Sequence, residues 1–384
     1  MIIELRGVGF VNKGAELMLV SILEKVRERY PHVLFVMGPA QGSTRQKLRE
    51  YDIFHSTDFR RFRTEFKNLF GYVPGSLRRR LRYITPKEVD VVLDASGFAY
   101  GDTWGAQYVK SLLTSHISEW KEEGKTVILL PQAFGPFTDR ELIVEMKRAL
   151  AHADLIFARD RVSFEYLAGL GASNDKIKVR PDFTNLISGE TPSDFLEAPG
   201  QVAIIPNSKM VEKVADSEGG AYIRLVELLI EKIRARGGVP LVLLHEEGEG
   251  DVRIADRIAE RFDGIPIIRE PNPLFVKGII GKCDAVVTSR FHGLVSALSQ
   301  GIPCLCTSWS HKYEMLLKDY AYPEAMVDVN LPESEVESKI DLILEPASNS
   351  TLRSRLSTEA RKQKELSNNM WREVFALIDR RTTQ

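Results

Sequence analysis

A cation and a titratable imidazole, Arg290 and His292, stand two positions apart in the stretch 284–298. The apolar run 285–287 before them indicates a buried strand, and apolar residues at helical spacing follow Gly293. A strand that becomes a helix here places both side chains at the carboxyl end of the strand, beside the free N–H groups of the helix N-terminus. Because ligands of open α/β sheets bind at that edge, the stretch is predicted to form an anion site with its own acid–base group.

Two carboxylates mark a second strand end. The buried run 91–93 ends at Asp94, and a loop of small residues that contains Ser96 leads to Asp102. Two acids on such a loop could bind sugar hydroxyls, or one of them could act as a general base. The alternative for Asp94 is a helix cap, because aspartate oxygens accept hydrogen bonds from the first N–H groups of a helix.

A glycine-containing loop, 7–14, joins the first predicted strand to a predicted helix. The dinucleotide fingerprint fails because Asn12 stands where the third glycine belongs, and the P-loop motif fails because Ala15-Glu16 follows Gly14. We therefore predict a loop that faces a ligand without a nucleotide signature. The alternative is that its glycines only permit a tight turn.

Two further strand ends carry titratable groups. Arg159 follows one predicted strand, where the alternative to a site residue is a surface salt bridge with Asp160. His245 ends another and precedes an acidic glycine loop that reaches Asp251. His245 and Asp251 are predicted either to close over a ligand or to be ordinary loop residues near the surface.

The segment 59–83 has eight cations and one acid, interleaved with aromatic residues. Its apolar residues follow helical spacing up to Pro74-Gly75, where the helix is predicted to end. A basic amphipathic helix of this kind can lie on an anionic membrane surface. The alternative is a helix whose apolar face meets the core and whose basic face meets solvent.

Length and composition are typical of a two-domain soluble protein. The chain has 384 residues, of which 43% are hydrophobic and 27% charged, and its formal net charge of −1 argues against bulk binding of nucleic acid. We expect no signal peptide and no membrane-spanning helix. The three cysteines lie among apolar residues of the sequence, which indicates reduced thiols. The expected location is cytoplasmic, with peripheral contact at the inner face of the membrane if the segment 59–83 binds there.

Strands alternate with helices in both halves of the sequence, which predicts two doubly wound, Rossmann-like α/β domains with parallel sheets. Residues 1–186 are expected to form the first domain and 201–348 the second, joined by a linker at 187–200 that is rich in Pro, Gly and Ser. Residues 349–384 are expected to form helices that pack back across the domains. A ligand cleft between the domains would resemble the GT-B arrangement of glycosyltransferases, a likeness at the level of the fold.

Several motifs together resemble the polysaccharide pyruvyl transferase family. They follow one another between residues 7 and 313 and lie at predicted strand ends. The matching pieces are Gly9-x-x-Asn12-x-Gly14-x-Glu16, Asp94-x-x-Gly97 with Asp102, Gln132-x-x-Gly135-Pro136, Ala158-Arg159-Asp160-x-x-Ser163, and Ser289-Arg290-x-His292 with Pro303 and Lys312. The chain departs from the family pattern at Ala15, where members often have Asp, and at Ser96, where many have Gly. Both departures bear on the identity of the acceptor.

The resemblance implies transfer of a pyruvyl group from phosphoenolpyruvate to two hydroxyls of a sugar, which forms a cyclic ketal and releases phosphate. The acceptor would be a sugar of a cell-surface polysaccharide or a lipid-linked oligosaccharide precursor, bound by the first domain, with the donor bound by the second. No metal is expected, because the sequence contains no evident cluster with metal-ligand spacing. No cofactor is expected either, since phosphoenolpyruvate would be a co-substrate.

The resemblance also implies roles for individual residues. His292 would be the general acid, because a histidine among phosphate-binding groups stays protonated near neutral pH. The base would be Asp94 or Asp102, with Glu16 as a further candidate. Donor binding is expected from Arg159, Arg290, Lys312 and His245, and acceptor binding from Asn12, Glu16 and Ser96. The alternative for Lys312 is a lysine on a helix surface.

Two other functions compete with this one. A GT-B glycosyltransferase that uses a nucleotide sugar would also bind a diphosphate with cations and a helix N-terminus. No acid in the second half stands out as a ligand for a ribose, which argues against it. A non-catalytic sugar-binding protein could keep the cleft without the chemistry.

Overall fold

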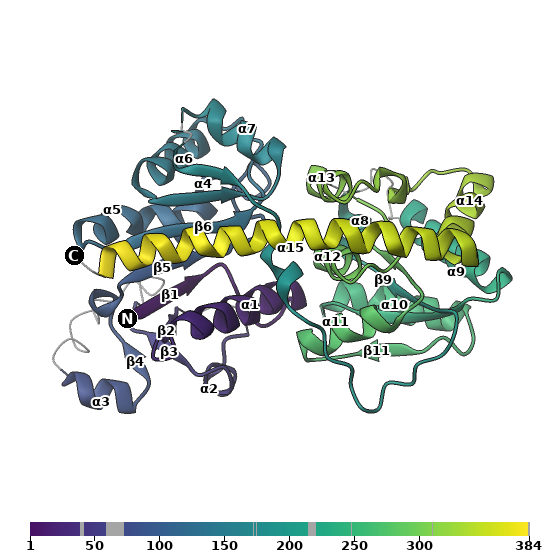
Figure 1. The fold of residues 1–384 in the computed structure, drawn as a ribbon, viewed down its shortest axis with the longest axis horizontal. Helices are drawn as coiled ribbons and strands as arrows, with labels where there is room; N and C mark the ends of the chain where they lie inside the picture. The colour runs from purple at the N-terminus through teal and green to yellow at the C-terminus, as the bar shows by residue number, and fades with distance from the viewer. Residues whose placement is uncertain are drawn as a thin grey trace. The chain divides into compact units, whose positions relative to one another are not determined.

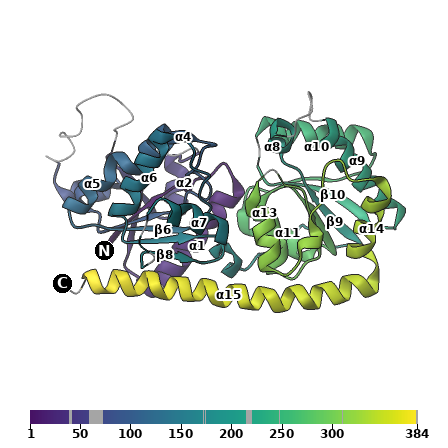
Figure 2. The same cartoon turned by 90° about the horizontal axis from the view of Figure 1, so that it is seen from above.

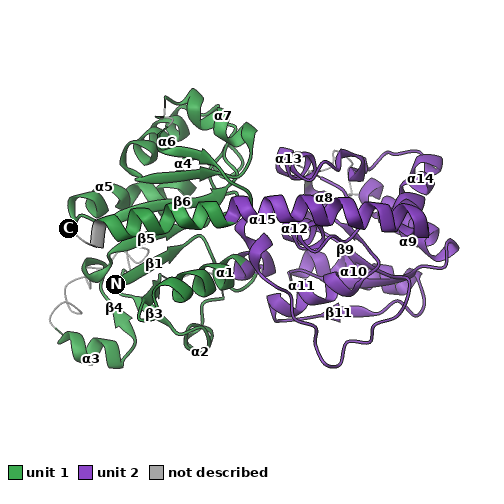
Figure 3. Ribbon diagram, in the orientation of Figure 1, with its two compact units in different colours: residues 1–11, 18–182, 368–384 green, residues 12–17, 183–367 purple. Residues whose placement is uncertain are grey.

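Parallel strands and helices alternate throughout the computed structural model (Figure 1). The structure describes residues 1–38, 42–58, 73–171, 173, 175–213, 220–246, 248–308 and 310–382. Contacts between residues divide the chain into two units, shown in different colours in Figure 3. Unit 1 comprises residues 1–11, 18–182 and 368–384, and unit 2 comprises 12–17 and 183–367.

Unit 1 contains a parallel sheet of eight strands in the order β4-β3-β2-β1-β5-β6-β7-β8. The strands are β1 (Ile2–Arg6), β2 (Leu34–Met37), β3 (Ile53–Ser56), β4 (Tyr83–Ile84), β5 (Val91–Asp94), β6 (Thr126–Gln132), β7 (Leu155–Ala158) and β8 (Ile177–Val179). The central strands β5 and β7 are largely apolar and fully buried, as expected where helices cover both faces of a parallel sheet. All seven residues of β6 are also buried.

Helices connect these strands in sequence order. They are α1 (Lys13–Arg29), α2 (Arg45–Glu50), α3 (Gly75–Arg80), α4 (Gly105–Val109), α5 (Ser115–Glu122), α6 (Arg140–His152) and α7 (Arg161–Gly169), with a π-helical segment at Lys110–Thr114 and a 3-10 turn at Pro86–Glu88. Helix α1 begins in the segment assigned to unit 2 and continues in unit 1.

Unit 2 contains a parallel sheet of five strands in the order β11-β10-β9-β12-β13. The strands are β9 (Gln201–Ile205), β10 (Val239–Leu244), β11 (Ile267–Arg269), β12 (Ala285–Thr288) and β13 (Cys304–Cys306). The helices are α8 (Ser208–Lys213), α9 (Gly220–Ala235), α10 (Glu249–Arg261), α11 (Pro273–Lys282), α12 (Phe291–Ser299), α13 (His311–Asp319) and α14 (Glu333–Leu344), with 3-10 turns at Phe183–Leu186 and Pro323–Ala325. Helix α15 (Pro346–Thr382) begins in unit 2, and its residues from 368 onward are assigned to unit 1. Figure 2 shows α8 and α10 on one side of this sheet and α11 and α13 on the other.

Each sheet reverses its strand order once. In unit 1 the reversal lies between β1 and β5, whose last residues Arg6 and Asp94 pair. In unit 2 it lies between β9 and β12, where Ile205 pairs with Thr288. Connections leave such a pair in opposite directions, and ligands of doubly wound sheets bind at its carboxyl end. Each unit therefore has its own switch point at the ends of strands that carry predicted site residues.

The predicted α/β class with two parallel sheets is confirmed, while the boundary between the halves differs from the expected one. Unit 2 begins at Phe183, and the linker expected at 187–200 is part of it. The N–H of Glu190 donates to the carbonyl of Leu274 in α11 at 3.0 Å. The segment after 349 is one helix, α15, of 37 residues.

Most of the basic segment 59–83 lies outside the described residues, which resume at Val73. Helix α3 begins at Gly75, where a helix was predicted to end. Three of the arginines there have acidic partners, since Arg78 and Arg79 pair with Glu88 and Arg82 pairs with Asp52. Within the described part of the chain, no helix is long and apolar enough to cross a membrane. Membrane contact by this segment stays a prediction.

Candidate functional site

The end of β12 leads directly into α12 at the switch point of unit 2. Ser289 continues the strand, with its N–H donating to the carbonyl of Ile205 at 2.9 Å. Arg290 is the N-cap residue of α12, with an extended backbone (φ −105°), and its side chain makes no capping bond. The first N–H groups of α12 have no acceptor within the helix, so this end carries a partial positive charge.

A network of buried hydroxyls holds Ser289 in place. Its Oγ lies 2.8 Å from the hydroxyl of Tyr222 and 2.6 Å from that of Thr307. Its carbonyl accepts from the Asn207 amide at 2.9 Å and from the Tyr313 hydroxyl at 3.0 Å. Burial raises the pKa of Tyr222 to about 12, so this hydroxyl stays protonated as a donor. The residue before Arg290 is therefore fixed by groups from four other segments.

Two carboxylates hold the guanidinium of Arg290. Its Nε donates to Oδ2 of Asp251 at 3.1 Å, Nη2 contacts the same oxygen, and Nη1 contacts Oε2 of Glu246. Burial alone lowers the pKa of Arg290, but Asp251 and Glu246 outweigh it, so the pKa lies above its ordinary value. The predicted anion ligand is thus a permanently charged group that already has anionic partners.

The segment 12–17 belongs to unit 2 although it lies at the N-terminal end of the sequence (Figure 3). Asn12 forms an antiparallel bridge with Glu246, and its Nδ2 donates to Oε2 of Glu246 at 3.3 Å. The N–H of Lys13 donates to the carbonyl of His245 at 3.3 Å. Glu16 is fully buried, with Oε2 3.4 Å from Nζ of Lys13. The first turn of α1 is therefore part of the site around Arg290.

Gly14 lies directly against the imidazole of His292. A Cβ atom at Gly14 would lie 2.2 Å from Nδ1 of His292, closer than any real contact. Asn12 holds this glycine in place, because its Oδ1 accepts from the N–H groups of Gly14 at 2.9 Å and Ala15 at 3.2 Å. The glycine of the Asn-x-Gly motif is therefore required by the close approach to a histidine far along the chain.

His245 is a buried, neutral imidazole beside these groups. Burial lowers its pKa well below the ordinary value, and the positive charges of Arg290, His292 and Lys13 act in the same direction. Its Nδ1 has no hydrogen-bond partner among the described residues. The three charged groups thus lie within electrostatic reach of one buried ring.

Lys312, in the first turn of α13, lies near the start of α12. Its Nζ is 5.4 Å from the ring centroid of Phe291 and 5.5 Å from that of Tyr313. Phe291 directly precedes His292, and the two rings meet edge to face at 5.4 Å. The ammonium of Lys312 therefore lies near the aromatic ring of the first residue of α12.

The carboxylate of Asp94, at the end of β5 in unit 1, is buried, and each of its oxygens accepts two hydrogen bonds. Oδ1 accepts from the Ser96 N–H and the Gln132 amide, each at 3.1 Å, and Oδ2 accepts from the Ser96 hydroxyl at 3.1 Å and the Tyr100 hydroxyl at 2.7 Å. A carboxylate offers about four lone-pair positions. The geometry favours a role in holding the loop 95–100 rather than in accepting a proton. A Cβ at Gly7 would lie 2.2 Å from Oγ of Ser96, so the N-terminal glycine loop packs on this same loop.

Asp102 is the more accessible acid of this loop. It is half-buried, and its carboxylate accepts from the N–H of Thr138 at 2.9 Å and from its hydroxyl at 2.8 Å. These bonds hold the turn before α6. The N–H of Asp102 itself donates to the carbonyl of Pro136 at 3.0 Å.

Arg159, at the end of β7, pairs with Asp182. Its Nη1 lies 3.1 Å from Oδ2 of Asp182, and both side chains are buried. Asp160 caps α7 through the N–H of Ser163 at 2.7 Å. Oγ of Ser163 accepts from the N–H of Phe134 at 3.0 Å, which joins this motif to the loop after Gln132.

The predicted residues thus fall into two groups. Unit 2 gathers Asn12, Glu16, His245, Arg290, His292 and Lys312, and unit 1 holds Asp94, Ser96, Asp102 and Arg159. Asn12 and Glu16, expected on the acceptor side, lie with the residues expected to bind the donor. Glu246 and Tyr222 also belong to the unit 2 site, although only the position of Glu246 after a predicted strand could have suggested it. Among the described residues, no cluster of three or more His, Cys, Asp or Glu could hold a metal ion.

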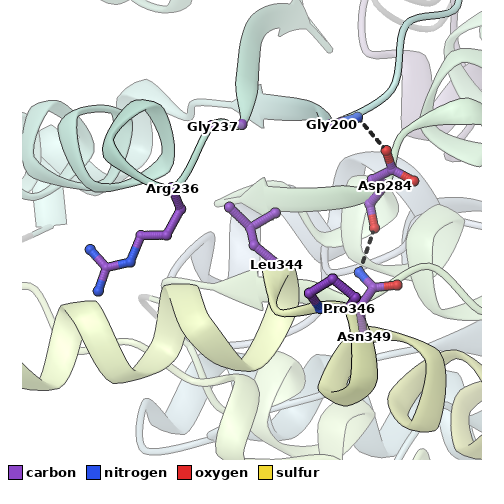
Figure 4. A pocket seen from close by; sticks show the side chains of 8 residues that line it. Gly200, Arg236, Gly237, Asp284, Leu344, Pro346 and Asn349 are labelled. Carbon is purple, nitrogen blue, oxygen red and sulfur yellow. Dashed lines mark hydrogen bonds between the residues drawn. The ribbon is translucent and has the colours of Figure 1, made fainter.

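A cavity of about 360 Å³ lies at the opposite edge of the unit 2 sheet (Figure 4). It is lined by Gly200, Arg236, Gly237, Gly238, Asp284, Leu344, Pro346 and Asn349. The carboxylate of Asp284 accepts from the N–H of Gly200 at 2.6 Å, and its carbonyl accepts from the Asn349 amide at 3.1 Å. These bonds tie the start of α15 to the sheet. Because the cavity lies at the amino ends of β9 and β12, we assign it no catalytic role.

Comparison with protein families identifies the chain. The family described as polysaccharide pyruvyl transferase matches residues 12–311. The chain belongs to the polysaccharide pyruvyl transferase family. The match begins at Asn12 and includes every candidate residue of the unit 2 site except Lys312.

Solved structures share the fold of this family member at low sequence identity. The Anabaena protein HepE in complex with UDP-glucose is 14% identical with a TM-score of 0.58, and the match covers 98% of this chain and 99% of that one. A UDP-GlcNAc 2-epimerase from Neisseria meningitidis bound to UDP-GlcNAc is 9% identical with a TM-score of 0.60, covering 98% of this chain and 100% of that one. At this identity the likeness concerns the fold alone.

Gly14→Ala is expected to displace the imidazole of His292 or the first turn of α1, because the new methyl group would overlap the ring. Such overpacking costs about 1–3 kcal/mol of stability. Urea denaturation measures the cost, and the histidine ring signals in NMR spectra report the displacement. Gly38→Ala is the matched control, since a Cβ there meets no atom of the described residues within 4 Å. Equal stability of the two variants, with the ring signal of His292 unmoved, would contradict the close approach.

The depressed pKa of His245 predicts a loss of stability in acid. Below about pH 6.5 the unfolded chain protonates this histidine while the folded chain does not. The unfolding free energy then falls by up to about 1.4 kcal/mol per pH unit. His245→Gln should make the slope between pH 6.5 and 5 shallower, whereas replacement of the exposed His32 should not. An unchanged slope in His245→Gln would show that the ring is not held neutral.

Proposed function

We propose that this family member transfers the pyruvyl group of phosphoenolpyruvate to two hydroxyls of a sugar, forming a cyclic ketal and releasing phosphate. The observation that carries the proposal is the position of Arg290 and His292 at the N-terminus of α12. Both residues lie inside the region matched by the family. The acceptor is a sugar of a cell-surface polysaccharide or of its lipid-linked precursor.

The donor's phosphate and carboxylate require several positive groups. The start of α12 offers its N–H groups, the guanidinium of Arg290 and the ammonium of Lys312. Arg290 makes three hydrogen bonds with Asp251 and Glu246, while a guanidinium has five N–H donors. Donor binding therefore adds to, or replaces, part of the bonding that this arginine already has. Arg159 in unit 1 is the second guanidinium assigned to the donor, held by Asp182.

His292 is the acid of the proposed reaction. Its proton goes to C3 of phosphoenolpyruvate, the π electrons form the new C–H bond, and C2 becomes an oxocarbenium-like electrophile. One sugar hydroxyl attacks C2 and gives its proton to a base. The bond from C2 to the phosphate oxygen then breaks, and phosphate leaves with the bonding electrons and the proton that the base took up. The second hydroxyl attacks C2, closes the ketal and gives its proton to His292, which restores the acid. Gly14 and Phe291 contact the imidazole and limit its orientation.

Unit 1 supports acceptor binding through Asp102 and an exposed aromatic pair. Asp94 and Glu16 are fully buried, so Asp102 is the candidate base with access to solvent. Trp104 and Tyr108 follow it, 46% and 41% exposed, with ring centroids 5.3 Å apart and planes inclined by 26°. The C–H groups on one face of a sugar ring are electropositive and pack on the negative face of an aromatic ring. The pair thus offers a platform for the acceptor beside the base.

Phosphate release tests the function directly. The chain should release phosphate from phosphoenolpyruvate only when a suitable sugar is present. His292→Ala should lower kcat by about 10²-fold or more, as loss of a general acid does, and leave the donor's dissociation constant nearly unchanged. His32→Ala, at an exposed position, is the control. Full activity of His292→Ala would remove this residue as the acid.

The aromatic platform makes a separate prediction. Trp104→Ala should raise KM for the sugar acceptor by about threefold to tenfold without changing the affinity for phosphoenolpyruvate, since aromatic stacking contributes about 0.5–1.5 kcal/mol. Val144→Ala removes another exposed apolar side chain of unit 1 and serves as the control. An acceptor KM equal to that of the unmodified chain would exclude Trp104 from the acceptor site.

The nucleotide-sugar alternative has one observation in its favour. Structures with this fold, HepE and the Neisseria epimerase, are complexes with UDP-glucose and UDP-GlcNAc. Release of UDP from nucleotide sugars, with no phosphate release from phosphoenolpyruvate, would favour a glycosyltransferase or a related enzyme. Binding of sugars without turnover of either donor would favour a sugar-binding protein.

A further inference from the structure

The two carboxylates on Arg290 differ in how firmly they are held. Asp251 is almost fully buried, and its second oxygen, Oδ1, accepts from the N–H of Ser208 at 2.9 Å. The side chain of Glu246 is 29% exposed. Its carboxylate also accepts a hydrogen bond from the amide of Asn12, at 3.3 Å. Asp251 is therefore fixed by the fold, whereas Glu246 lies where solvent and ligands reach it.

Arg290 and its two carboxylate partners, taken together, do not suit an anionic ligand in this arrangement. One guanidinium with two carboxylates has a net charge of −1. An anion that approaches Nη1 meets the carboxylate of Glu246 in the same position, and like charges repel strongly where water is partly excluded. Removal of Glu246 from the guanidinium leaves a neutral pair of Arg290 and Asp251, beside the positive end of α12.

We propose that Glu246 is a built-in placeholder for an anionic group of the donor. Its carboxylate occupies the Nη1 edge of Arg290 in the free protein, and a phosphate or carboxylate group of the ligand takes that position by displacing it. Asp251 stays in place and orients the guanidinium throughout. This inference rests on the proposed function for the identity of the donor, although the displacement itself applies to any anion bound at Arg290.

The placeholder also sets a requirement on the ligand. The incoming group must outcompete an internal carboxylate that is already tethered nearby, so a highly charged anion is favoured over a weakly charged one. Phosphoenolpyruvate has two anionic groups, one for Arg290 and one for the N–H groups of α12. Glu246 is thus a specificity-determining residue that acts through competition.

A purely structural role for Glu246 predicts the opposite result. If Glu246 only holds the segment 12–17 through Asn12, its replacement loosens that segment and weakens binding at the neighbouring helix end. The placeholder role predicts that the same replacement strengthens binding. The sign of the change in affinity distinguishes the two.

The test is calorimetric titration of the full chain with phosphoenolpyruvate and, separately, with inorganic phosphate. Glu246→Gln keeps the shape of the side chain and removes its charge, and it should tighten binding of each anion by about fivefold, the value of a partly exposed ion pair that no longer has to be broken. Glu249→Gln, which removes the same charge from an exposed position in the first turn of α10, should change each affinity less than twofold. Glu246→Asp keeps the charge on a shorter side chain. Its affinity for each anion should lie between the affinities of Glu246→Gln and Glu249→Gln.

Unchanged or weaker anion binding in Glu246→Gln, or an equal gain in Glu249→Gln, would overturn the placeholder. The same holds if Glu246→Gln binds neither anion. A gain in affinity for inorganic phosphate without any binding of phosphoenolpyruvate would support the placeholder and count against the proposed donor. A chain that binds and turns over phosphoenolpyruvate with no gain in Glu246→Gln would leave the proposed function standing without the placeholder.

Discussion

The ion pair between Arg290 and Asp251 is the interaction on which the unit 2 site depends. It joins the end of β12 to the start of α10, and the other oxygen of Asp251 binds the first N–H of α8. A buried arginine without a carboxylate would leave an uncompensated charge, which is strongly destabilising. Three elements that meet at the switch point are therefore held by a single carboxylate.

The segment 12–17 is also part of the site around Arg290. Asn12 caps the first turn of α1 and bonds to Glu246, so the N-terminal motif is tied to the loop after β10. Gly14 then contacts His292 without an intervening side chain. The orientation of the proposed acid thus depends on residues near the beginning of the chain, which explains why the Asn-x-Gly pattern and the Arg-x-His pattern form one site.

The acids of unit 1 have different structural roles from one another. Asp94 satisfies four donors from the loop 95–100 and β6, and this fixes the shape of the carboxyl edge. Asp102 bonds to Thr138 and keeps contact with solvent beside Trp104 and Tyr108. A buried carboxylate with all its lone pairs occupied is suited to positioning, and an accessible one is suited to proton transfer.

The sequence was sufficient for the α/β class, the parallel sheets and the position of Arg290 and His292 at a strand end, because strand and helix periodicities are properties of neighbouring residues. It also carried the family resemblance, which the match over residues 12–311 supports. The boundary between the units was harder to predict from the sequence, because the segment expected to be a linker packs on α11 through Glu190.

The partners of the site residues were decided by the tertiary structure alone. Asp251 lies 39 positions from Arg290, and Glu246 lies 234 positions from Asn12. Such pairs depend on which strands become neighbours in the sheet, and no local pattern encodes that order. The type and spacing of residues therefore determined which chemistry is available, while the strand order determined which charges meet and which carboxylates remain accessible.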